Sequence, residues 1–239
     1  MSENLTKEDV LICKVVLLGE SSVGKTCIIT RFIDNLFQQD VITTTGASYA
    51  TKSILYKDYH NKIIKFEIWD TAGQEKYRSL TQIFYKDAAI AILVYDITSE
   101  KSFEEMENYW YKQIKEFAPP NIIIGIAGNK FDLFNDEKIP EDKAKNFAKE
   151  AGGIFRYTSA KESVGIQELF VLLGLKYLDP NFVDDGKFLP QTNLAGINNE
   201  NNNNGKNRNR GESIKLNKEK IKEKKKKFCR IYIFVFSII

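Results

Sequence analysis

Residues 19–26, Gly-Glu-Ser-Ser-Val-Gly-Lys-Thr, have the composition and spacing of a phosphate-binding loop and directly follow the apolar run 15–18. Glycines let the backbone fold back so that successive N–H groups point at phosphate oxygens, and the start of a helix adds partial positive charge. Lys25 is expected to reach the β- and γ-phosphates of a nucleotide, and Thr26 a magnesium ion. The predicted phosphate-binding residues of this loop are Gly19, Ser21, Ser22, Val23, Gly24, Lys25, Thr26 and Cys27.

A second polar group, Asp70 to Gln74, follows the apolar stretch 63–69. Asp70 is expected where a strand ends beside the phosphate loop, and there it would hold the same magnesium ion. The backbone N–H of Gly73 can approach a γ-phosphate closely because glycine has no side chain. The amide of Gln74 can orient an attacking water, so Gln74 and Lys25 are the predicted catalytic residues.

A third group, Asn129, Lys130 and Asp132, follows the apolar run 122–127 and points to recognition of a base. A carboxylate only accepts hydrogen bonds, so Asp132 suits the two adjacent donors of guanine, which adenine lacks. Leaving a buried charged acceptor without its donors can discriminate between bases on the order of 10⁴-fold. Further guanine contacts are expected from the later strand end, where Ser159, Ala160 and Lys161 follow one another.

Less specific interpretations of these motifs stay open at this point. A glycine-containing turn between a strand and a helix can carry an incidental lysine, and a polar turn explains Asp70 and Gly73 taken alone. An ATP-using enzyme would need only Lys25 and Asp70, whereas Asp132 favours guanine. A protein that binds the nucleotide without hydrolysing it is a further alternative, against which Gln74 argues.

The apolar runs that carry these motifs alternate with helical patterns, which is typical of an α/β fold with a mostly parallel sheet. The stretch 48–56 is rich in β-branched and aromatic residues and predicts a hairpin with the next strand, adding one antiparallel strand. We therefore expect a six-stranded sheet in the order βαββαβαβαβα, with a short helix after Gly73. The other predicted strands are 13–18, 63–69, 90–95, 122–127 and 154–158, and the helices are 24–35, 102–117, 141–151 and 165–178.

The net charge of +3 hides an asymmetry along the chain of 239 residues. Residues 206–230 contain 12 Lys or Arg and 3 Glu, so they carry +9 and the remainder carries −6. A folded region of that sign has no electrostatic footprint for nucleic acid, so none is expected as a partner. The three cysteines are far apart and form no C-x-x-C pair, which suits a reducing, cytoplasmic location.

With these motifs, residues 11–178 resemble the small GTPases of the Ras superfamily. The sequence between the motifs looks most like the Rab family of membrane-traffic switches. The Rab-like stretches are 44–49, 65–69, 76–81, 84–88 and 93–98. Within the family, Gly46-Ala47 and the stretch 121–129 look closest to the early-endosome branch. The resemblance implies a P-loop NTPase G domain that hydrolyses GTP slowly with Mg²⁺, assisted by an exchange factor, an activating protein and effectors.

The resemblance also assigns roles that spacing alone does not. It implies that Thr44 contacts both the magnesium ion and the γ-phosphate, and that Phe37 packs against guanine. It further implies an effector surface built from Tyr49, Trp69 and Phe84. Ordinary partly buried aromatics remain the alternative for these three residues.

The sequence predicts two parts, a GTPase domain over residues 8–180 and an Asn-rich, Lys-rich tail over 181–239. The tail contains the basic run 222–227 and then the apolar stretch 228–239, which is shorter than the ~20 residues of a bilayer span. A basic run beside a weak anchor, or acylation of Cys229, would favour an anionic membrane surface. We expect a peripheral protein on the cytosolic face of endomembranes; a solvated charged tail is the alternative.

Overall fold

The computed structural model describes residues 10–38, 44, 47–71 and 83–184 of the chain. These residues form a six-stranded sheet in the order β2-β3-β1-β4-β5-β6. Every neighbouring pair of strands is parallel except β2 and β3, which pair antiparallel from Ala47 opposite Thr71 to Tyr56 opposite Lys62. The predicted hairpin and sheet class are confirmed. The strands are β1 (Val10–Leu18), β2 (Ala47–Tyr56), β3 (Lys62–Thr71), β4 (Ile90–Asp96), β5 (Ile123–Asn129) and β6 (Ile154–Tyr157).

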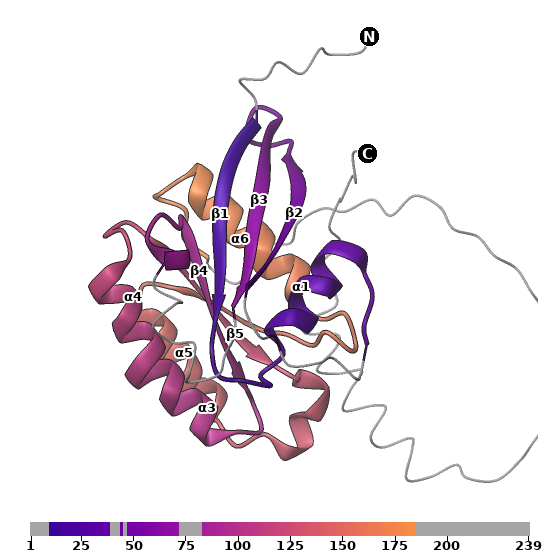
Figure 1. Ribbon diagram of the computed structural model, residues 1–239, viewed down its shortest axis with the longest axis vertical. Helices are drawn as coiled ribbons and strands as arrows, with labels where there is room; N and C mark the ends of the chain where they lie inside the picture. The colour runs from indigo at the N-terminus through magenta and orange to yellow at the C-terminus, as the bar shows by residue number, and fades with distance from the viewer. Residues whose placement is uncertain (1–9, 39–43, 45–46, 72–82, 185–239) are drawn as a thin grey trace, which may run out of the picture. The chain divides into compact units, whose positions relative to one another are not determined.

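Helices cover both faces of this sheet (Figure 1). Helices α1 (Lys25–Asp34) and α6 (Ile166–Leu178) lie on one face, and α3 (Glu100–Glu105), α4 (Tyr111–Phe117) and α5 (Glu141–Glu150) lie on the other. Right-handed crossovers between parallel strands place successive helices in this way. None of the helices in the described part of the chain is long and apolar enough to cross a bilayer.

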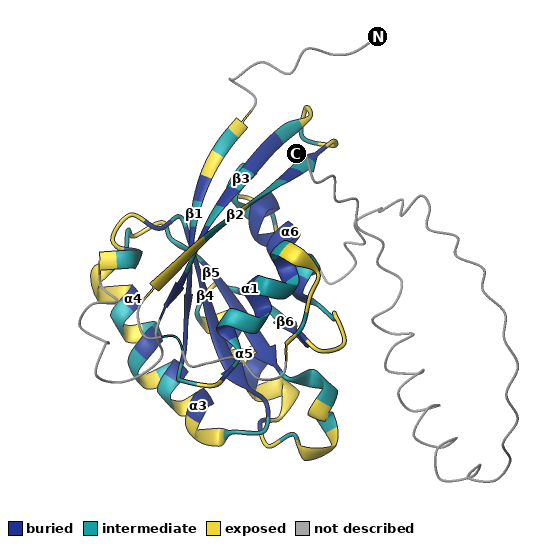
Figure 2. Ribbon diagram, turned by 45° about the vertical axis from the view of Figure 1, so that its right-hand side comes forward, coloured by how far each residue is buried: buried dark blue, intermediate teal, exposed yellow. Residues whose placement is uncertain are grey.

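The core lies between the sheet and its two helical layers, and Figure 2 shows β4 and β5 as buried along almost their whole length. All seven residues of β4 are buried, as expected of a central parallel strand with both faces covered. Under α1 and α6, the rings of Phe32 and Phe170 stack with centroids 3.7 Å apart, and Phe66 meets Phe170 edge-on at 5.9 Å. This cluster fixes α1, and with it the loop that precedes α1, against β3 and α6.

The single helix predicted over 102–117 is more irregular than expected. It begins at Glu100, where the Ser99 side chain accepts a hydrogen bond from the Ser102 backbone N–H, and widens into a π-helical segment, η3 (Met106–Trp110), before α4. A 3₁₀ segment, η4 (Phe131–Asp136), was also not predicted. The short helix expected after Gly73 falls mainly on residues outside the described part, although 83–85 are helical.

The topology brings the predicted motifs to one edge of the sheet. Strands β1, β3, β5 and β6 end at Leu18, Thr71, Asn129 and Tyr157, and the polar groups singled out in the sequence lie at or just after these ends. In open α/β sheets ligands bind outside the carboxyl ends of the strands. The sheet therefore positions all three motifs for one ligand.

Candidate nucleotide-binding site

The phosphate loop between β1 and α1 has a backbone that two of its glycines make possible. Gly19 and Gly24 have φ angles of +150° and +96°. A Cβ at Gly19 would lie 2.2 Å from the Val94 carbonyl oxygen, and one at Gly24 would lie 2.4 Å from Nδ2 of Asn129. Both positions therefore require glycine, for backbone conformation as well as for space.

Lys25, the first residue of α1, folds back over this loop. Its Nζ donates to the carbonyl oxygens of Gly19 at 2.8 Å and Glu20 at 2.9 Å, and only 6% of the residue is exposed. Burial lowers the pKa of Lys25 to about 8, although Asp70 and Glu20 act in the opposite direction. An ammonium group held this way gains strongly from a phosphate that neutralises it.

The three predicted magnesium ligands converge beside Lys25. The Thr26 hydroxyl donates to Oδ2 of Asp70 at 2.6 Å and lies 2.9 Å from the Thr44 hydroxyl, which is itself 3.5 Å from the same carboxylate oxygen. Asp70 is 2% exposed, and burial raises its pKa against the effect of the Thr26 hydrogen bond. Residues 26, 44 and 70 come from α1, an intervening loop and β3, so the fold alone unites them.

This cluster fits a small hard cation. All three side chains offer oxygen, the donor that Mg²⁺ prefers, and few protein ligands suffice because the ion keeps several waters. Oδ1 of Asp70 is buried and has no hydrogen-bond partner among the described residues. An unsatisfied buried carboxylate oxygen next to two hydroxyls is the feature that a bound cation would relieve.

Asp132, the predicted guanine ligand, is held in place by the loop after β6. The Ser159 hydroxyl donates to Oδ1 of Asp132 at 2.6 Å and accepts from the Glu162 backbone N–H at 3.1 Å. Lys130 adopts the left-handed conformation, with φ of +63°, and its Nζ pairs with Asp96 at 2.7 Å. The carboxylate thus points from a braced loop, with its second oxygen available to a ligand.

Asn129 connects the two halves of the site. Its Nδ2 donates to the carbonyl oxygen of Val23 in the phosphate loop at 2.8 Å, and its Oδ1 accepts from the Thr158 hydroxyl at 3.1 Å. The side chain is 2% exposed, so both hydrogen bonds are shielded from water. Asn129 therefore acts as a strut between the phosphate loop and the loop after β6.

Two residues that support the site, Arg31 and Asp96, were not among the site residues predicted from the sequence. Arg31 of α1 donates from Nε to the carbonyl oxygen of Ala160 at 2.7 Å and from Nη2 to that of Lys161 at 3.4 Å. Asp96, the partner of Lys130, also accepts from the backbone and hydroxyl of Thr98 at 2.9 and 2.7 Å. No local motif marks Arg31 or the pairing of Asp96 with Lys130, because these partners lie far apart in the sequence.

The predicted effector aromatics form a continuous surface rather than part of the core. The Tyr49 and Trp69 rings meet at 5.2 Å between centroids, and Trp69 meets Phe84 at 5.4 Å. Tyr49 is 50% exposed, and the other two are partly exposed. The surface lies over β2 and β3, next to Thr71, where β3 ends.

Other predicted residues are placed less closely or lie outside the described part. Phe37 is half-buried beyond α1, and the described contacts do not connect it to Asn129, Asp132 or Ser159. Cys27 is partly buried in α1, next to Thr26. Gly73, Gln74 and Cys229 lie outside the described residues.

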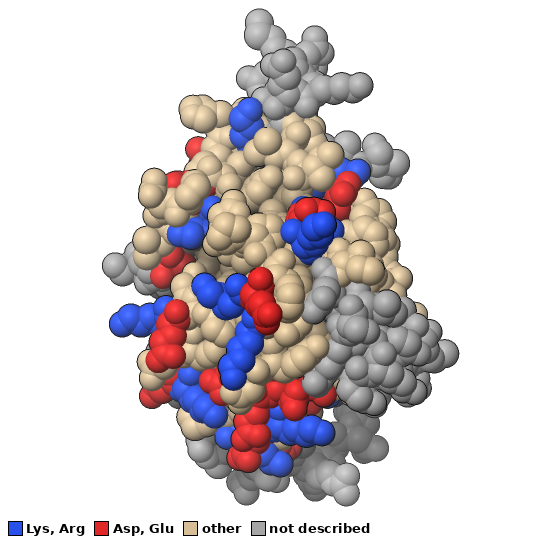
Figure 3. Space-filling model, turned by 60° about the vertical axis from the view of Figure 1, so that its left-hand side comes forward, with Lys and Arg blue, Asp and Glu red and all other residues tan. Residues whose placement is uncertain are grey.

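The charge on the face shown in Figure 3 is mixed, with Lys and Arg interleaved with Asp and Glu. Several charged side chains of the described residues are paired, including Lys145 with Glu141 at 2.8 Å and Lys65 with Glu67 at 3.5 Å. A surface that binds a nucleic acid backbone needs clustered positive charge instead. The charges on this face are interleaved rather than clustered in that way.

Comparison with known proteins agrees with the geometry of the site. Residues 14–178 match the Ras family. The human Ras-related protein Rab-22A is 43% identical over 176 residues, which cover 73% of this chain and 89% of that protein. The mouse Ras-related protein Rab-31 is 44% identical over 157 residues, covering 66% of this chain and 78% of its own length.

Proposed function

This chain belongs to the Ras family of small GTPases and, within it, to the Rab proteins, and from that premise we propose how its residues bind and sense the nucleotide. The protein binds GTP, hydrolyses it to GDP and phosphate, and acts as a switch in membrane traffic. An exchange factor, an activating protein and effectors are its partners. The convergence of the Thr26, Thr44 and Asp70 oxygens beside Lys25 carries the assignment of roles.

The phosphate loop binds the phosphates through its backbone N–H groups and the start of α1. Lys25 then exchanges its two carbonyl partners for oxygens of the β- and γ-phosphates. Cys27 and the residues of 21–24 contribute backbone contacts. This exchange is favourable because a buried ammonium gains more from an anion than from neutral carbonyl oxygens.

Thr26, Thr44 and Asp70 would hold Mg²⁺, with Asp70 using its unpartnered oxygen directly or through a water. When bound, the ion neutralises charge that develops on the phosphate oxygens during transfer. Thr44 also senses the γ-phosphate, together with the Gly73 backbone, and Gln74 orients the attacking water. Loss of the γ-phosphate on hydrolysis then releases both segments, which is the switch.

Asp132 selects guanine by accepting from its two adjacent donors, and Ser159 orients that carboxylate. The Ala160 backbone N–H faces the base carbonyl, and the Lys130, Lys161 and Phe37 side chains flank the rings. The test is Asp132→Asn, which replaces one acceptor oxygen with a donor. We expect the preference for GTP over XTP to reverse, because xanthine presents an acceptor where guanine has its amino group.

Fluorescent GTP, XTP and ATP analogues measure this preference, and single-turnover decay of GTP with Gln74→Leu measures hydrolysis. Unchanged GTP preference in Asp132→Asn would contradict the base assignment. Unchanged turnover in Gln74→Leu would contradict the catalytic role of Gln74, whereas no turnover in the wild type, with or without an activating protein, would support the non-hydrolysing alternative. Ser163→Ala is a suitable control, because Ser163 is exposed and close in sequence to the guanine contacts.

Effectors would read the surface formed by Tyr49, Trp69 and Phe84. Tyr49 and Trp69 lie on β2 and β3, which follow Thr44 and end at Thr71, so a change at the γ-phosphate would reach this surface through the chain on either side of it. Tyr49→Ala should abolish capture of the GTP-bound form by an effector while leaving nucleotide affinity unchanged. Retained capture would refute this surface.

The tail would attach the protein to the cytosolic face of endomembranes, and we place the protein on endosomes. Each Lys or Arg near an anionic leaflet contributes ~1 kcal/mol, so the basic run 222–227 adds several such increments. Cys229 or the apolar residues after it supply the weak anchor that such a run needs. The full-length chain and a chain truncated after residue 221 should differ in the fraction that sediments with membranes. A tagged full-length chain should colocalise with early endosomes. Equal fractionation would overturn the attachment.

A further inference from the structure

Tyr157, the last residue of β6, lies next to the segment from Lys130 to Glu137 that carries Asp132, which we call the guanine loop. It is not among the residues expected to touch the nucleotide. It is 3% exposed, and its ring lies against β5, where a Cβ added to Gly128 would be 3.0 Å from the Tyr157 Cδ1. The side chain is therefore fixed from the sheet side. It also meets the Phe155 ring edge-on within β6, and two further contacts reach the segment that carries Asp132.

The Tyr157 ring stacks on Phe131, with centroids 4.6 Å apart and 24° between the planes. Phe131 begins η4 and stands between Lys130 and Asp132 in the sequence. Its backbone N–H donates to the Thr158 carbonyl oxygen at 3.0 Å, so side chain and backbone both join it to the end of β6. The stack thus fixes the start of the guanine loop.

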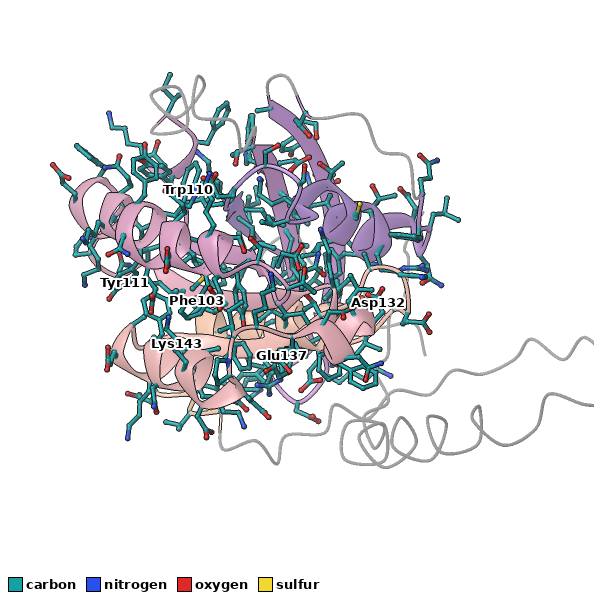
Figure 4. All side chains as sticks on the ribbon, turned by 90° about the horizontal axis from the view of Figure 1, so that it is seen from below. Phe103, Trp110, Tyr111, Asp132, Glu137 and Lys143 are labelled. Atoms are coloured by element: carbon teal, nitrogen blue, oxygen red, sulfur yellow. The ribbon has the colours of Figure 1, made fainter. Side chains whose placement is uncertain are left out.

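The Tyr157 hydroxyl reaches the other end of the same segment. It donates to Oε1 of Glu137 at 2.5 Å, and Glu137 ends η4 with its own N–H bonded to the Phe134 carbonyl oxygen. Figure 4 shows Asp132 and Glu137 at the two ends of this segment. One side chain therefore contacts η4 at its first residue and at its C-cap, with Asp132 between the two contacts.

We propose that Tyr157 and Phe131 form a brace that positions Asp132 and so tunes affinity and selectivity for guanine. This inference rests on the proposed guanine-binding role of Asp132. The brace acts through Asp132 and does not contact the base, which makes Tyr157 and Phe131 positioning residues. Ser159 orients one carboxylate oxygen, and the brace fixes the backbone from which that carboxylate projects.

The test compares Tyr157→Leu and Phe131→Leu with wild type in two measurements on the full chain. One is the dissociation rate of fluorescent GDP, and the other is the ratio of the dissociation constants for IDP and GDP. IDP lacks the 2-amino group that Asp132 would bind, so this ratio reports on the placement of the carboxylate. We expect each variant to release GDP about threefold to tenfold faster and the ratio to fall by a similar factor.

Two further variants separate positioning from loss of structure. Tyr157→Phe keeps the stack and loses the Glu137 hydrogen bond, so it should restore most of the ratio. Phe155→Leu removes a ring that meets Tyr157 edge-on at 5.0 Å, and it should leave both measurements within about twofold of wild type. The double variant Phe131→Leu/Tyr157→Leu should lose little more than either single variant, because the two rings act as one unit.

An unchanged IDP-to-GDP ratio in both Leu variants would overturn the brace, even if dissociation were faster. Should Tyr157→Leu fail to fold, Phe131→Leu decides alone, because Phe131 is only half-buried. Asp132→Asn distinguishes the two levels of the argument. If that change reverses base preference while the brace variants keep the ratio, only the brace is wrong; if it does not, the guanine assignment fails first.

Discussion

The phosphate side and the guanine side of the site are built on opposite principles. On the phosphate side, Lys25 is a buried cation with carbonyl oxygens as its hydrogen-bond acceptors, and Asp70 keeps a buried oxygen without a described partner. On the guanine side, polar side chains are cross-linked, as Ser159 to Asp132 and Arg31 to Ala160 show. The phosphate side holds charged groups that a ligand would satisfy, whereas on the guanine side the loop that carries Asp132 is already cross-linked before a ligand binds.

This difference suggests that the two sides make different contributions to nucleotide binding. A preorganised base site gives selectivity at little cost, because the ligand need not order it. A charged site short of partners gives a large gain when phosphate and Mg²⁺ arrive, and a large loss when the γ-phosphate leaves. Asn129 hydrogen-bonds to both sides, so we expect the proposed base site to help hold the phosphate loop in place.

The largest expected effect is a loss of GTP affinity from a substitution on the phosphate side. Lys25→Met should weaken GTP binding by about 4 kcal/mol, or ~10³-fold, because it removes charge-assisted hydrogen bonds to two phosphates. Lys52→Met is a matched control, since Lys52 is another partly buried lysine whose ammonium donates to a carbonyl oxygen, that of Phe32. Titration calorimetry should find its affinity within about twofold of wild type. Equal losses in both variants would contradict the special role of Lys25.

The second effect is a pH dependence that the guanine side should not share. Because burial lowers the Lys25 pKa to about 8, the folded protein binds fewer protons than the unfolded chain between that pH and the ordinary lysine range. The free energy of unfolding of the nucleotide-free protein should therefore rise with pH across this window, by about 3 kcal/mol at most. Below this pH window the buried ammonium is charged, and it lowers the free energy of unfolding by the full amount.

Denaturant titrations between pH 7.5 and 10.5 measure this rise, and Lys25→Met should remove it. The same titrations with saturating GDP should also flatten it, since phosphate stabilises the charged lysine. A rise that survives in Lys25→Met would assign the pH dependence to another group. In that case the contrast between the two sides would lose its electrostatic basis.

The sequence predicted the parts of this arrangement that local pattern encodes. Glycine spacing, apolar runs and strand-end polar groups were enough to predict the order of elements and to bring Lys25, Asp70 and Asp132 to one edge. The π-helical segment η3 was not predictable, because the buried residues Phe103, Met106, Trp110 and Ile114 keep the three- and four-residue spacing of an ordinary α-helix. Arg31 and Tyr157 were missed because their partners lie 129 and 20 residues away.

Asp184, near the end of the described residues, was likewise not predictable from local sequence. Asp184 pairs with the Arg156 guanidinium through two hydrogen bonds of 2.6 and 3.0 Å, and Glu168 shares that cation. Polar residues just before an Asn-rich stretch look like the start of a tail in the sequence. Only the fold shows that this carboxylate is bound to β6.

A smaller effect separates backbone conformation from steric fit at the phosphate loop. Gly24→Ala should weaken GDP binding by about 2 kcal/mol, because its φ is left-handed and its new Cβ would press on Asn129 at 2.4 Å. Gly152→Ala is the matched control, since Gly152 also has a positive φ of +64° and nothing lies within 4 Å of its added Cβ. Gly152→Ala should cost about 1 kcal/mol of stability and no affinity. Equal affinity losses would show that strain anywhere in the fold reaches the site.

The smallest effect tests whether the guanine side is truly preorganised. Arg31→Ala removes the hydrogen bond from Nε to the Ala160 carbonyl oxygen and should speed GDP dissociation about twofold to fivefold, since one such bond contributes ~1 kcal/mol. Lys145→Ala, which removes only an exposed pair with Glu141, is the control and should change nothing measurable. Fluorescent GDP release gives the rates, and amide exchange of residues 158–162 reports whether the loop loosens. If release accelerates without loosening, Arg31 acts on the nucleotide and not on the loop, and the guanine side owes its rigidity to Ser159 and Asn129 instead.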